Sequence, residues 1–598
     1  MKTVNISIKD TRVTLVTAVF LSLFLLVEIR LFQIQILDHQ KYRSLADEQY
    51  QGLTIINAKR GNILSSDGFT LAGNQINYLL FAEPKIISDK EVFSKNTALA
   101  LSNIMSARSS GSNSVEDLFP NYYDQVFKSV SKNLMWVPLE RGLTPNERKY
   151  FEGQQITGVG FEEEPIRYYP EGALASHILG FVASNDTGEK VGYYGVEGSL
   201  NEDLKGKPGK ITEETDATGL PILIGSYKKI DPIQGRDVVL TINRSVQYVV
   251  EKQLKAGVEK YNAVSGSIIV MDPYTGSVLA LANYPTYNPE DLTQDDTQVD
   301  EKTKRKLIER KDLAISETYE PGSVMKPFTV SAAVDSGLVT PETTYQDAGP
   351  VYYSGKRVDN WDGKHWGTLN IIQLLQKSNN IGAAWVGSLV GNKRLYDYLT
   401  NFGFGSKTNI DLEGEDSGIL RDYLGWTAID LAAASFGQGL SATPLQVLNG
   451  FNAIANGGFL LEPKIILKIK DAKKDILMPT KNIRRVISTK TDLTMVDLLE
   501  KAAEGGEAKY YTLKDYRVAG KTGTAQIPEE GGYSPDRTNA TFVGFLSGAK
   551  RFTMIVRLQE PKTSIYAAET AVPLWMDIAA ELVKYFGIAP DKVPAGSN

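Results

Sequence analysis

The chain of 598 residues is long enough for three or four domains of ordinary size. Its composition is that of a globular protein, and its net charge of −6 offers no basis for nucleic-acid binding, so we expect no DNA or RNA partner. Because the chain has no cysteine, thiol nucleophiles, disulfides and Cys-ligated zinc are excluded, and only His39, His177 and His365 could supply the base of a Ser-His-Asp triad.

The first forty residues have the pattern of a membrane anchor. Basic residues precede an uncharged run from Val13 to Val27, which predicts that the N-terminus stays in the cytoplasm. A helix of this run spans roughly 22 Å, a length that also suits a cleavable signal peptide. No small-residue cleavage site follows, and apolar residues continue to Leu37. We therefore predict a cytoplasmic tail at 1–12, an uncleaved single-pass anchor and juxtamembrane helix at 13–37, and the bulk of the chain outside the plasma membrane.

The hydrophobic pattern of the sequence changes near residue 232. Residues 237–242 have the alternation of a strand, and residues 245–261 have a helical period. We expect a mixed domain at 40–231, a C-terminal domain at 232–588 and a tail at 589–598.

The C-terminal domain has strand patterns at both ends and helices between them. Two apolar segments flank the turn that begins at Asp272, and residues 539–546 and 551–559 are expected to be neighbouring strands of the same sheet. The last helix should end before Gly587 and present one apolar stripe, formed by Leu574, Ile578, Leu582 and Tyr585. The pattern predicts an α+β or α/β domain with one sheet.

The segment YEPGSVMKPF (319–328) brings a hydroxyl and an amine together. Ser323 and Lys326 lie about one helical turn apart, close enough for the amine to take the hydroxyl proton. Pro327 is tolerated only in the first turn of a helix, so we expect the helix to begin at Ser323. The spacing alone is weak, because Ser-x-x-Lys also begins at Ser129, Ser226 and Ser547.

Two later clusters of residues make the Ser-x-x-Lys pattern at Ser323 more specific. QKSNNIG contains Ser378 and Asn380, and VAGKTGTAQ contains Lys521, Thr522, Gly523 and Thr524. The order Ser-x-x-Lys, Ser-x-Asn, Lys-Thr-Gly is typical of serine enzymes that react with penicillin. With TINRSVQ, MDPYTGSVLALA and FGQGLSATPLQ, the chain closely resembles the class B penicillin-binding proteins, the D,D-transpeptidases that cross-link peptidoglycan.

The N-terminal part resembles the pedestal, or dimerisation, domain of that family. AKRGNIL (58–64), IRYYP (166–170) and YGVEGSL (194–200) are similar to its motifs. Ser65 and Ser66 stand where the family usually has Asp-Arg, and Asn243 replaces an Asp, which puts local salt bridges in doubt. The phrase YEPGSVMKPF and the segment YGVEGSLNEDLKGKPGK favour the septal, FtsI-like branch over the elongation branch. The resemblance implies an α+β multidomain protein: anchor, elongated pedestal, and a transpeptidase domain with a central antiparallel sheet flanked by helices.

The residues suggest how acyl transfer would proceed. Ser323 is the expected nucleophile, and Lys326 is the expected base because no histidine lies in the motif. An ordinary lysine, with a pKa of about 10.4, would be protonated, so the pKa of Lys326 must be lowered by burial and by a second cation, Lys521. Ser378 is expected to relay a proton to the leaving amine.

The remaining motif residues are expected to hold the substrate. The Asn380 amide should contact Lys326 and a peptide carbonyl. Lys521, with Thr522 or Thr524, offers a cation and hydroxyls to the terminal carboxylate. Gly523 should let an extended peptide pair with the strand edge. The backbone N–H groups of Ser323 and Thr524 are the expected oxyanion hole.

We therefore expect acyl transfer between peptidoglycan stem peptides, acylation by β-lactams, and no metal or organic cofactor. A β-lactamase has the same motifs but needs a deacylating base, and the pedestal and anchor argue against it. A non-catalytic division scaffold is the remaining alternative, although every catalytic side chain is present. The resemblance also implies partners in the membrane: a polytopic glycosyltransferase and other divisome proteins.

Overall fold

The computed structural model describes residues 11–43, 51–109, 113–214, 227–291, 310–471, 474–511 and 513–592. The chain divides into two compact units. The first comprises Met1–Ala58 and Gly206–Gln234, and the second comprises Lys59–Lys205 and Gly235–Asn598. The domain boundary expected near residue 232 stays a prediction.

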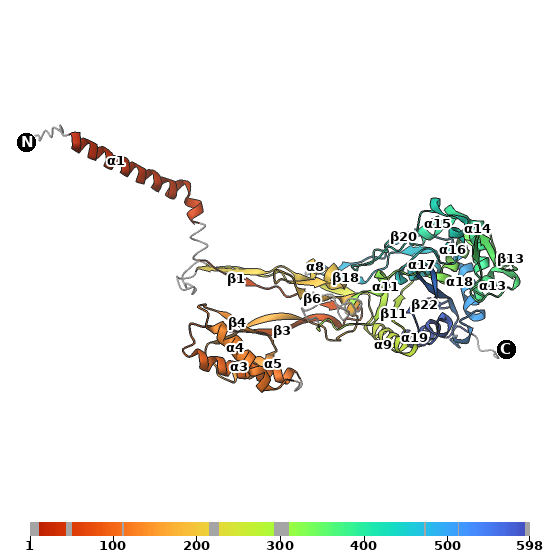
Figure 1. Ribbon diagram of the computed structural model, residues 1–598, viewed down its shortest axis with the longest axis horizontal. Coiled ribbons are helices and arrows are strands. Elements are labelled where there is room, and N and C mark those ends of the chain that lie inside the picture. Colours follow the sequence, from red (N-terminus) through yellow and green to blue (C-terminus); the bar gives the residue numbers. More distant parts are fainter. Residues whose placement is uncertain are drawn as a thin grey trace, which may run out of the picture. The chain divides into compact units, whose positions relative to one another are not determined.

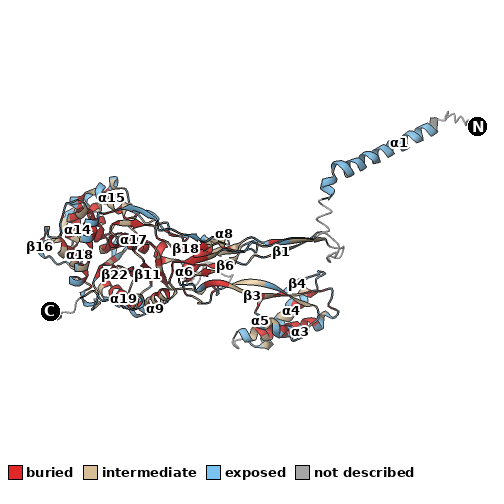
Figure 2. Cartoon of the chain, turned by 180° about the vertical axis from the view of Figure 1, so that it is seen from behind, coloured by how far each residue is buried: buried red, intermediate tan, exposed pale blue. Residues whose placement is uncertain are grey.

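The first unit begins with the expected apolar helix. Helix α1 (Thr11–Phe32) continues as one π-helical turn, η1 (Gln33–Leu37), and its side chains from Val13 to Phe32 are exposed (Figure 2). The segment Val13–Leu37 has 25 residues and contains an 18-residue window with a mean hydropathy of 2.3. At 1.5 Å per residue it extends about 37 Å, enough to cross a bilayer. The helix is longer than the uncharged run because Glu28 and Arg30 lie within it, and Arg30 donates a hydrogen bond to Gln33 (2.8 Å).

A small antiparallel sheet completes the first unit. Strand β8 (Gly209–Glu214) lies between β1 (Gln51–Ile56) and β9 (Tyr227–Ile230). This sheet joins the start and the end of the expected pedestal region, since Ile56 pairs with Gly209.

The second unit contains a mixed sheet to which both halves of the sequence contribute. Its order is β19-β18-β10-β2-β3-β4, and β5 pairs with β3. The strands are β2 (Ile63–Leu64), β3 (Thr70–Ala82), β4 (Val137–Leu143), β5 (Val159–Tyr168), β10 (Asp237–Leu240), β18 (Ile466–Lys470) and β19 (Ile476–Leu477). The parallel pair Ile63 and Val238 is fully buried, so this junction is part of the core.

Three helices cover the far part of this sheet: α3 (Lys90–Arg108), α4 (Val115–Val130) and α5 (Pro145–Glu152). Their starts follow ordinary capping rules. Asp89 and Ser114 accept hydrogen bonds from first-turn N–H groups. Thr144, which directly precedes Pro145, forms a capping box with Glu147. A separate apolar cluster that includes Leu80 and Leu101 fills the space beneath them.

A buried carboxylate ties the pedestal motifs together. Glu197, in α7 (Gly195–Ser199), is fully buried and forms ion pairs of 2.5 Å with both Arg60 and Arg167. Each arginine comes from a different segment of the chain, so one carboxylate joins three segments. The short elements around it are α6 (Ser176–Leu179), β6 (Phe181–Ser184), β7 (Lys190–Tyr193) and α8 (Asn201–Lys205).

The central sheet of the C-terminal half is antiparallel, in the order β12-β11-β23-β22-β21. Its strands are β11 (Ser265–Met271), β12 (Val278–Tyr284), β21 (Val518–Glu529), β22 (Gly532–Leu546) and β23 (Thr553–Gln559). The predicted hairpin, β11 with β12, and the predicted neighbours, β22 and β23, are confirmed. Alternate residues belong to different cores: Ile268 contacts one cluster and Ile269 the other, so the sheet is buried on both faces.

Helices cover both faces of this sheet (Figure 1). One face packs against α9 (Arg244–Tyr261) and α19 (Ala571–Phe586), which contact each other. In α19 the stripe is buried at Leu574, Ile578 and Leu582 and the helix ends at Gly587, but the prediction for Tyr585 is wrong. Tyr585 is exposed, and its hydroxyl donates to the carboxamide oxygen of Asn243, the cap of α9.

The other face packs against a helical region that supplies Ser323, Lys326, Ser378 and Asn380. Two short 3-10 turns, η4 (Lys509–Tyr511) and η5 (Ala567–Glu569), contact α19 instead. The helices of this region are α11 (Leu313–Ser316), η2 (Gly322–Met325), α12 (Lys326–Asp335), α13 (Ile371–Gln376), α14 (Asn380–Val390), α15 (Asn392–Asn401), η3 (Tyr423–Gly425), α16 (Ala428–Ser435), α17 (Pro444–Ala455) and α18 (Thr489–Gly505). Its strands are β13 (Thr344–Asp347), β14 (Val351–Tyr353), β15 (Lys356–Val358), β16 (Gly367–Asn370), β17 (Phe459–Leu461) and β20 (Asn482–Arg485).

The buried ion pairs of Glu197 should dominate the stability of the second unit. Glu197→Gln leaves two buried guanidinium groups without a counter-charge, so we expect a loss of about 3–5 kcal/mol. Thermal unfolding followed by tryptophan fluorescence measures this loss. Glu152→Gln, at an exposed i,i+4 pair with Arg148, is the control and should change stability by about 0–1 kcal/mol. Equal effects of the two changes would contradict the account.

Candidate active site

Ser323 and Lys326 meet at the junction of two kinds of helix. Ser323 lies in the 3-10 turn η2, and α12 begins at Lys326 with Pro327 in its first turn. The helix expected to begin at Ser323 is therefore present, but its first turn is a 3-10 turn that begins at Gly322, and α-helical geometry begins at Lys326. In a 3-10 turn, residues i and i+3 eclipse each other, and the Lys326 amine accordingly lies 2.9 Å from the Ser323 hydroxyl.

Lys326 is fully buried behind the partly exposed Ser323. Its amine contacts the Ser378 hydroxyl at 3.2 Å and donates a short hydrogen bond to the Ser378 carbonyl. Burial lowers the pKa of Lys326 well below its ordinary value, and the nearby Lys521 ammonium lowers it further. Both causes that the sequence predicts for a depressed pKa are thus present.

Ser378 connects the two lysines. The Lys521 amine donates to the Ser378 hydroxyl at 3.0 Å, so this one hydroxyl contacts both amines. Ser378 lies between α13 and α14 with φ of 52°, in the left-handed region that a non-glycine residue rarely adopts. A strained backbone at this position turns the hydroxyl toward the lysines.

Strand β21 supplies Lys521 and Thr522, both of which are buried. Within the described part of the chain, β21 lies at the end of the sheet order and pairs with β22 alone in that sheet. Thr524, two residues further along, is partly exposed, and its hydroxyl accepts a hydrogen bond from the N–H of Ala567 at 3.0 Å. The strand therefore aligns a cation and two hydroxyls along one edge of the sheet.

Gly523 sets the distance between β21 and the Ser323 turn. A β-carbon at this position would lie 2.9 Å from the Val324 side chain and 3.0 Å from the Pro321 carbonyl. The turn itself is held from its other side, since the N–H of Gly322 donates to the carbonyl of Gly437 at 3.0 Å. A β-carbon on Gly437 would lie 2.1 Å from the Gly322 carbonyl oxygen. Sequence reasoning did not single out Gly437 as part of the site.

The Asn380 side chain is not where the sequence predicted it. Among the described residues, the Lys326 amine has hydrogen bonds with Ser323 and Ser378 and none with Asn380. The Asn380 amide nitrogen donates instead to the Asp359 carbonyl at 2.9 Å. The correction has a geometric reason: Ser378 is the last residue before the N-cap of α14, and Asn380, the first residue of that helix, faces the 359–366 loop.

A buried carboxylate that the sequence did not reveal holds that loop. Asp347 is fully buried and accepts hydrogen bonds from the Asn379 amide (2.8 Å), the Trp366 N–H (3.1 Å) and the Asn360 amide (3.2 Å). His365 also contacts Asp347 at 3.2 Å, so it belongs to this network and not to Ser323. The Asn360 oxygen in turn accepts the N–H of Asn380.

Comparison with known families identifies this arrangement. The penicillin-binding protein transpeptidase domain matches residues 266–580, more than half of the chain, and the penicillin-binding protein dimerisation domain matches residues 55–240. The chain belongs to the penicillin-binding protein transpeptidase family. It is of the class B, FtsI-like type, with an N-terminal apolar helix, a dimerisation domain and a serine-type transpeptidase domain, as the sequence predicted.

Individual relatives align with this chain along nearly its full length. Stage V sporulation protein D of Bacillus subtilis is 29% identical over 99% of this chain and 88% of its own. Peptidoglycan D,D-transpeptidase FtsI of Escherichia coli K12 is 28% identical over 91% of this chain and 86% of its own. Among solved structures, penicillin binding protein 2X of Streptococcus thermophilus is 25% identical with a TM-score of 0.73. The match covers 89% of this chain and 80% of that protein. Penicillin binding protein 3 of Mycobacterium tuberculosis, in complex with aztreonam, is 24% identical and shares the fold with a TM-score of 0.66. The match covers 90% of this chain and 98% of that protein.

The close approach at Gly523 yields a prediction. Gly523→Ala should lower the rate of acylation by a β-lactam about 10²-fold, because a β-carbon there moves β21 away from the Ser323 turn. Gel-based labelling with fluorescent penicillin over time measures the rate. The control is Gly425→Ala, whose β-carbon would meet no atom within 4 Å. A Gly523→Ala protein that is acylated as fast as the control would refute this role.

Proposed function

We propose that Ser323 is the nucleophile of a D,D-transpeptidase that cross-links stem peptides through an acyl-enzyme and is trapped there by β-lactams. The observation that supports this most directly is the contact of the Ser323 hydroxyl with a fully buried lysine amine at 2.9 Å. A buried amine with a lowered pKa can accept a proton at neutral pH, which an ordinary lysine cannot.

The first half-reaction opens the donor peptide. Lys326 takes the proton of Ser323 as the hydroxyl oxygen bonds to the carbonyl carbon of the terminal D-Ala-D-Ala amide. The C–N bond then breaks, and the departing D-Ala amine receives a proton from Ser378, which Lys326 replenishes. The backbone N–H groups of Ser323 and Thr524 stabilise the oxyanion of the tetrahedral intermediate.

In the second half-reaction an amine of a neighbouring stem peptide attacks the acyl carbon and its proton passes to Lys326. Lys326 returns that proton to the Ser323 oxygen as the acyl–oxygen bond breaks, which restores the hydroxyl and the neutral amine. Lys521, with Thr522 or Thr524, binds the donor carboxylate, and Asn380 holds a peptide carbonyl. The open edge of β21 at Gly523 accommodates an extended substrate strand. A β-lactam follows the first half-reaction, but its leaving group stays attached and blocks the acceptor amine.

The proposal extends to where the enzyme works. Residues 13–37 anchor it in the plasma membrane with residues 1–12 in the cytoplasm, while the pedestal (40–231) and the transpeptidase domain (232–588, with a tail at 589–598) lie outside. Its proposed partners are a polytopic membrane glycosyltransferase that makes the glycan strands and other divisome proteins. The FtsI-named relatives support a septal role.

Labelling with fluorescent penicillin tests the nucleophile. Ser323→Ala should be unlabelled, because only Ser323 combines a base with the Lys521 carboxylate site. Ser547→Ala, which changes another Ser-x-x-Lys serine, should label as the wild type does. A label that survives in Ser323→Ala, or that mass spectrometry maps to another serine, would refute the assignment.

Microscopy of a fluorescent fusion of the full chain tests the septal role. We expect the fusion to concentrate at the division site of the cells that make it, and Ser323→Ala to concentrate there too, because the substitution leaves anchor and pedestal intact. Even distribution along the side wall would favour the elongation role. A signal confined to developing spores would favour a role like that named for the Bacillus subtilis relative.

A further inference from the structure

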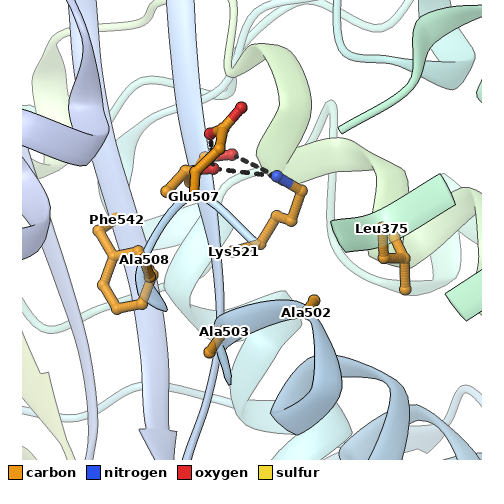
Figure 3. A pocket seen from close by; sticks show the side chains of 9 residues that line it. Leu375, Ala502, Ala503, Glu507, Ala508, Lys521 and Phe542 are labelled. Atoms are coloured by element: carbon orange, nitrogen blue, oxygen red, sulfur yellow. Dashed lines mark hydrogen bonds between the residues drawn. The ribbon is translucent and has the colours of Figure 1, made fainter. Parts of the chain in front are cut away.

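Glu507 lies at the end of a line of hydrogen bonds that starts at the nucleophile. The residue follows α18, and its carboxylate accepts a hydrogen bond of 2.5 Å from the Thr522 hydroxyl. The Thr522 hydroxyl in turn lies 3.0 Å from the Lys521 amine (Figure 3). Lys521 contacts the Ser378 hydroxyl, as does Lys326, which contacts Ser323.

The charges along this line are unbalanced without Glu507. Two buried amines share the Ser378 hydroxyl, and burial disfavours a positive charge on either of them. The small pocket beside Lys521 is lined by Leu375 of α13, Ala502 and Ala503 of α18, and Phe542 of β22. Among the described residues that line it, Glu507 and Lys521 are the ionisable ones with opposite charges, so Glu507 is the counter-charge on the Lys521 side.

We propose that Glu507 is a positioning residue that decides which lysine holds the proton: its carboxylate keeps Lys521 an ammonium, and that ammonium keeps Lys326 neutral. This inference rests on acylation of Ser323 with Lys326 as the base. A charged Lys521 is needed for the substrate carboxylate, and a neutral Lys326 is needed for the serine proton. Glu507 assigns these opposite states to two amines that share one hydroxyl.

Glu507 acts on the two lysines in different ways. Burial lowers the pKa of Lys521, and Glu507 opposes that effect, which favours the ammonium. For Lys326, burial and then the charge of Lys521 lower the pKa, whereas the direct effect of Glu507 is smaller and raises it. As long as Lys521 keeps its proton, neutralising Glu507 therefore lowers the pKa of both amines.

The sign of the effect on the rate follows from these roles. Acylation rises with pH as Lys326 loses its proton, so a lower pKa of Lys326 moves this rising limb toward acid. Acylation falls at higher pH as Lys521 loses its proton, so a lower pKa of Lys521 moves the falling limb in the same direction. A role in folding alone would lower the rate at every pH and leave both limbs in place.

The test measures the second-order rate of acylation by benzylpenicillin against pH, using the full-length protein in detergent. In Glu507→Gln, which retains an oxygen for Thr522, both limbs should move toward acid by about 1 pH unit. Glu504→Gln, three residues earlier at the end of α18 and paired with Lys592, is the matched control and should leave the profile in place. Unmoved limbs in Glu507→Gln would overturn the proposal.

A second variant keeps the test decisive. Glu507→Asp retains the charge, so its limbs should stay within a few tenths of a pH unit of the wild type, and limbs shifted as far as in Glu507→Gln would contradict a role based on charge. If Glu507→Gln shows no cooperative thermal transition, Glu507→Ala takes its place as the neutral variant, and its limbs should move toward acid relative to those of Glu507→Asp. Failure of the proposed function is distinguishable, because wild-type Ser323 would then not be acylated at any pH.

Discussion

Two buried amines that share one hydroxyl are the constraint on which the rest of this site depends. The Ser378 hydroxyl lies 3.2 Å from the Lys326 amine and 3.0 Å from the Lys521 amine. Two like charges about 4–6 Å apart repel by roughly 3–4 kcal/mol at an effective dielectric constant near 20, so the protein favours one charged and one neutral lysine. In the proposed mechanism the neutral lysine is Lys326, which contacts Ser323, where catalysis needs a base.

The surrounding fold holds this pair at fixed spacing. The central sheet is buried on both faces, which leaves β21 little freedom to move, and Gly523 lets that strand contact the Ser323 turn directly. The Gly437 carbonyl fixes the turn from its other side, and Asp347 fixes the loop that Asn380 contacts. Gly437 and Asp347 lie outside the three motifs, but each holds a segment that carries a motif residue.

Much of the architecture was predictable from the sequence, because hydrophobic alternation and turn residues are local signals. The anchor, the β11–β12 hairpin, the β22–β23 pair and the end of α19 at Gly587 all follow from short stretches. Motif order predicted that Ser323, Lys326, Ser378 and Lys521 would meet. The 3-10 turn at Ser323 and the left-handed backbone at Ser378 were not predictable, because tertiary contacts impose both. Glu507 and Asp347 were missed because their partners are distant in sequence and belong to no pattern.

The central claim is that Lys326 is neutral when Ser323 attacks, and the pH dependence of wild-type acylation tests it most directly. The rate constant for acylation by benzylpenicillin should rise through a midpoint well below the ordinary lysine value, since burial and Lys521 both lower the pKa of Lys326. A rate that continues to rise to about pH 10, with the midpoint of an ordinary lysine, would contradict the account.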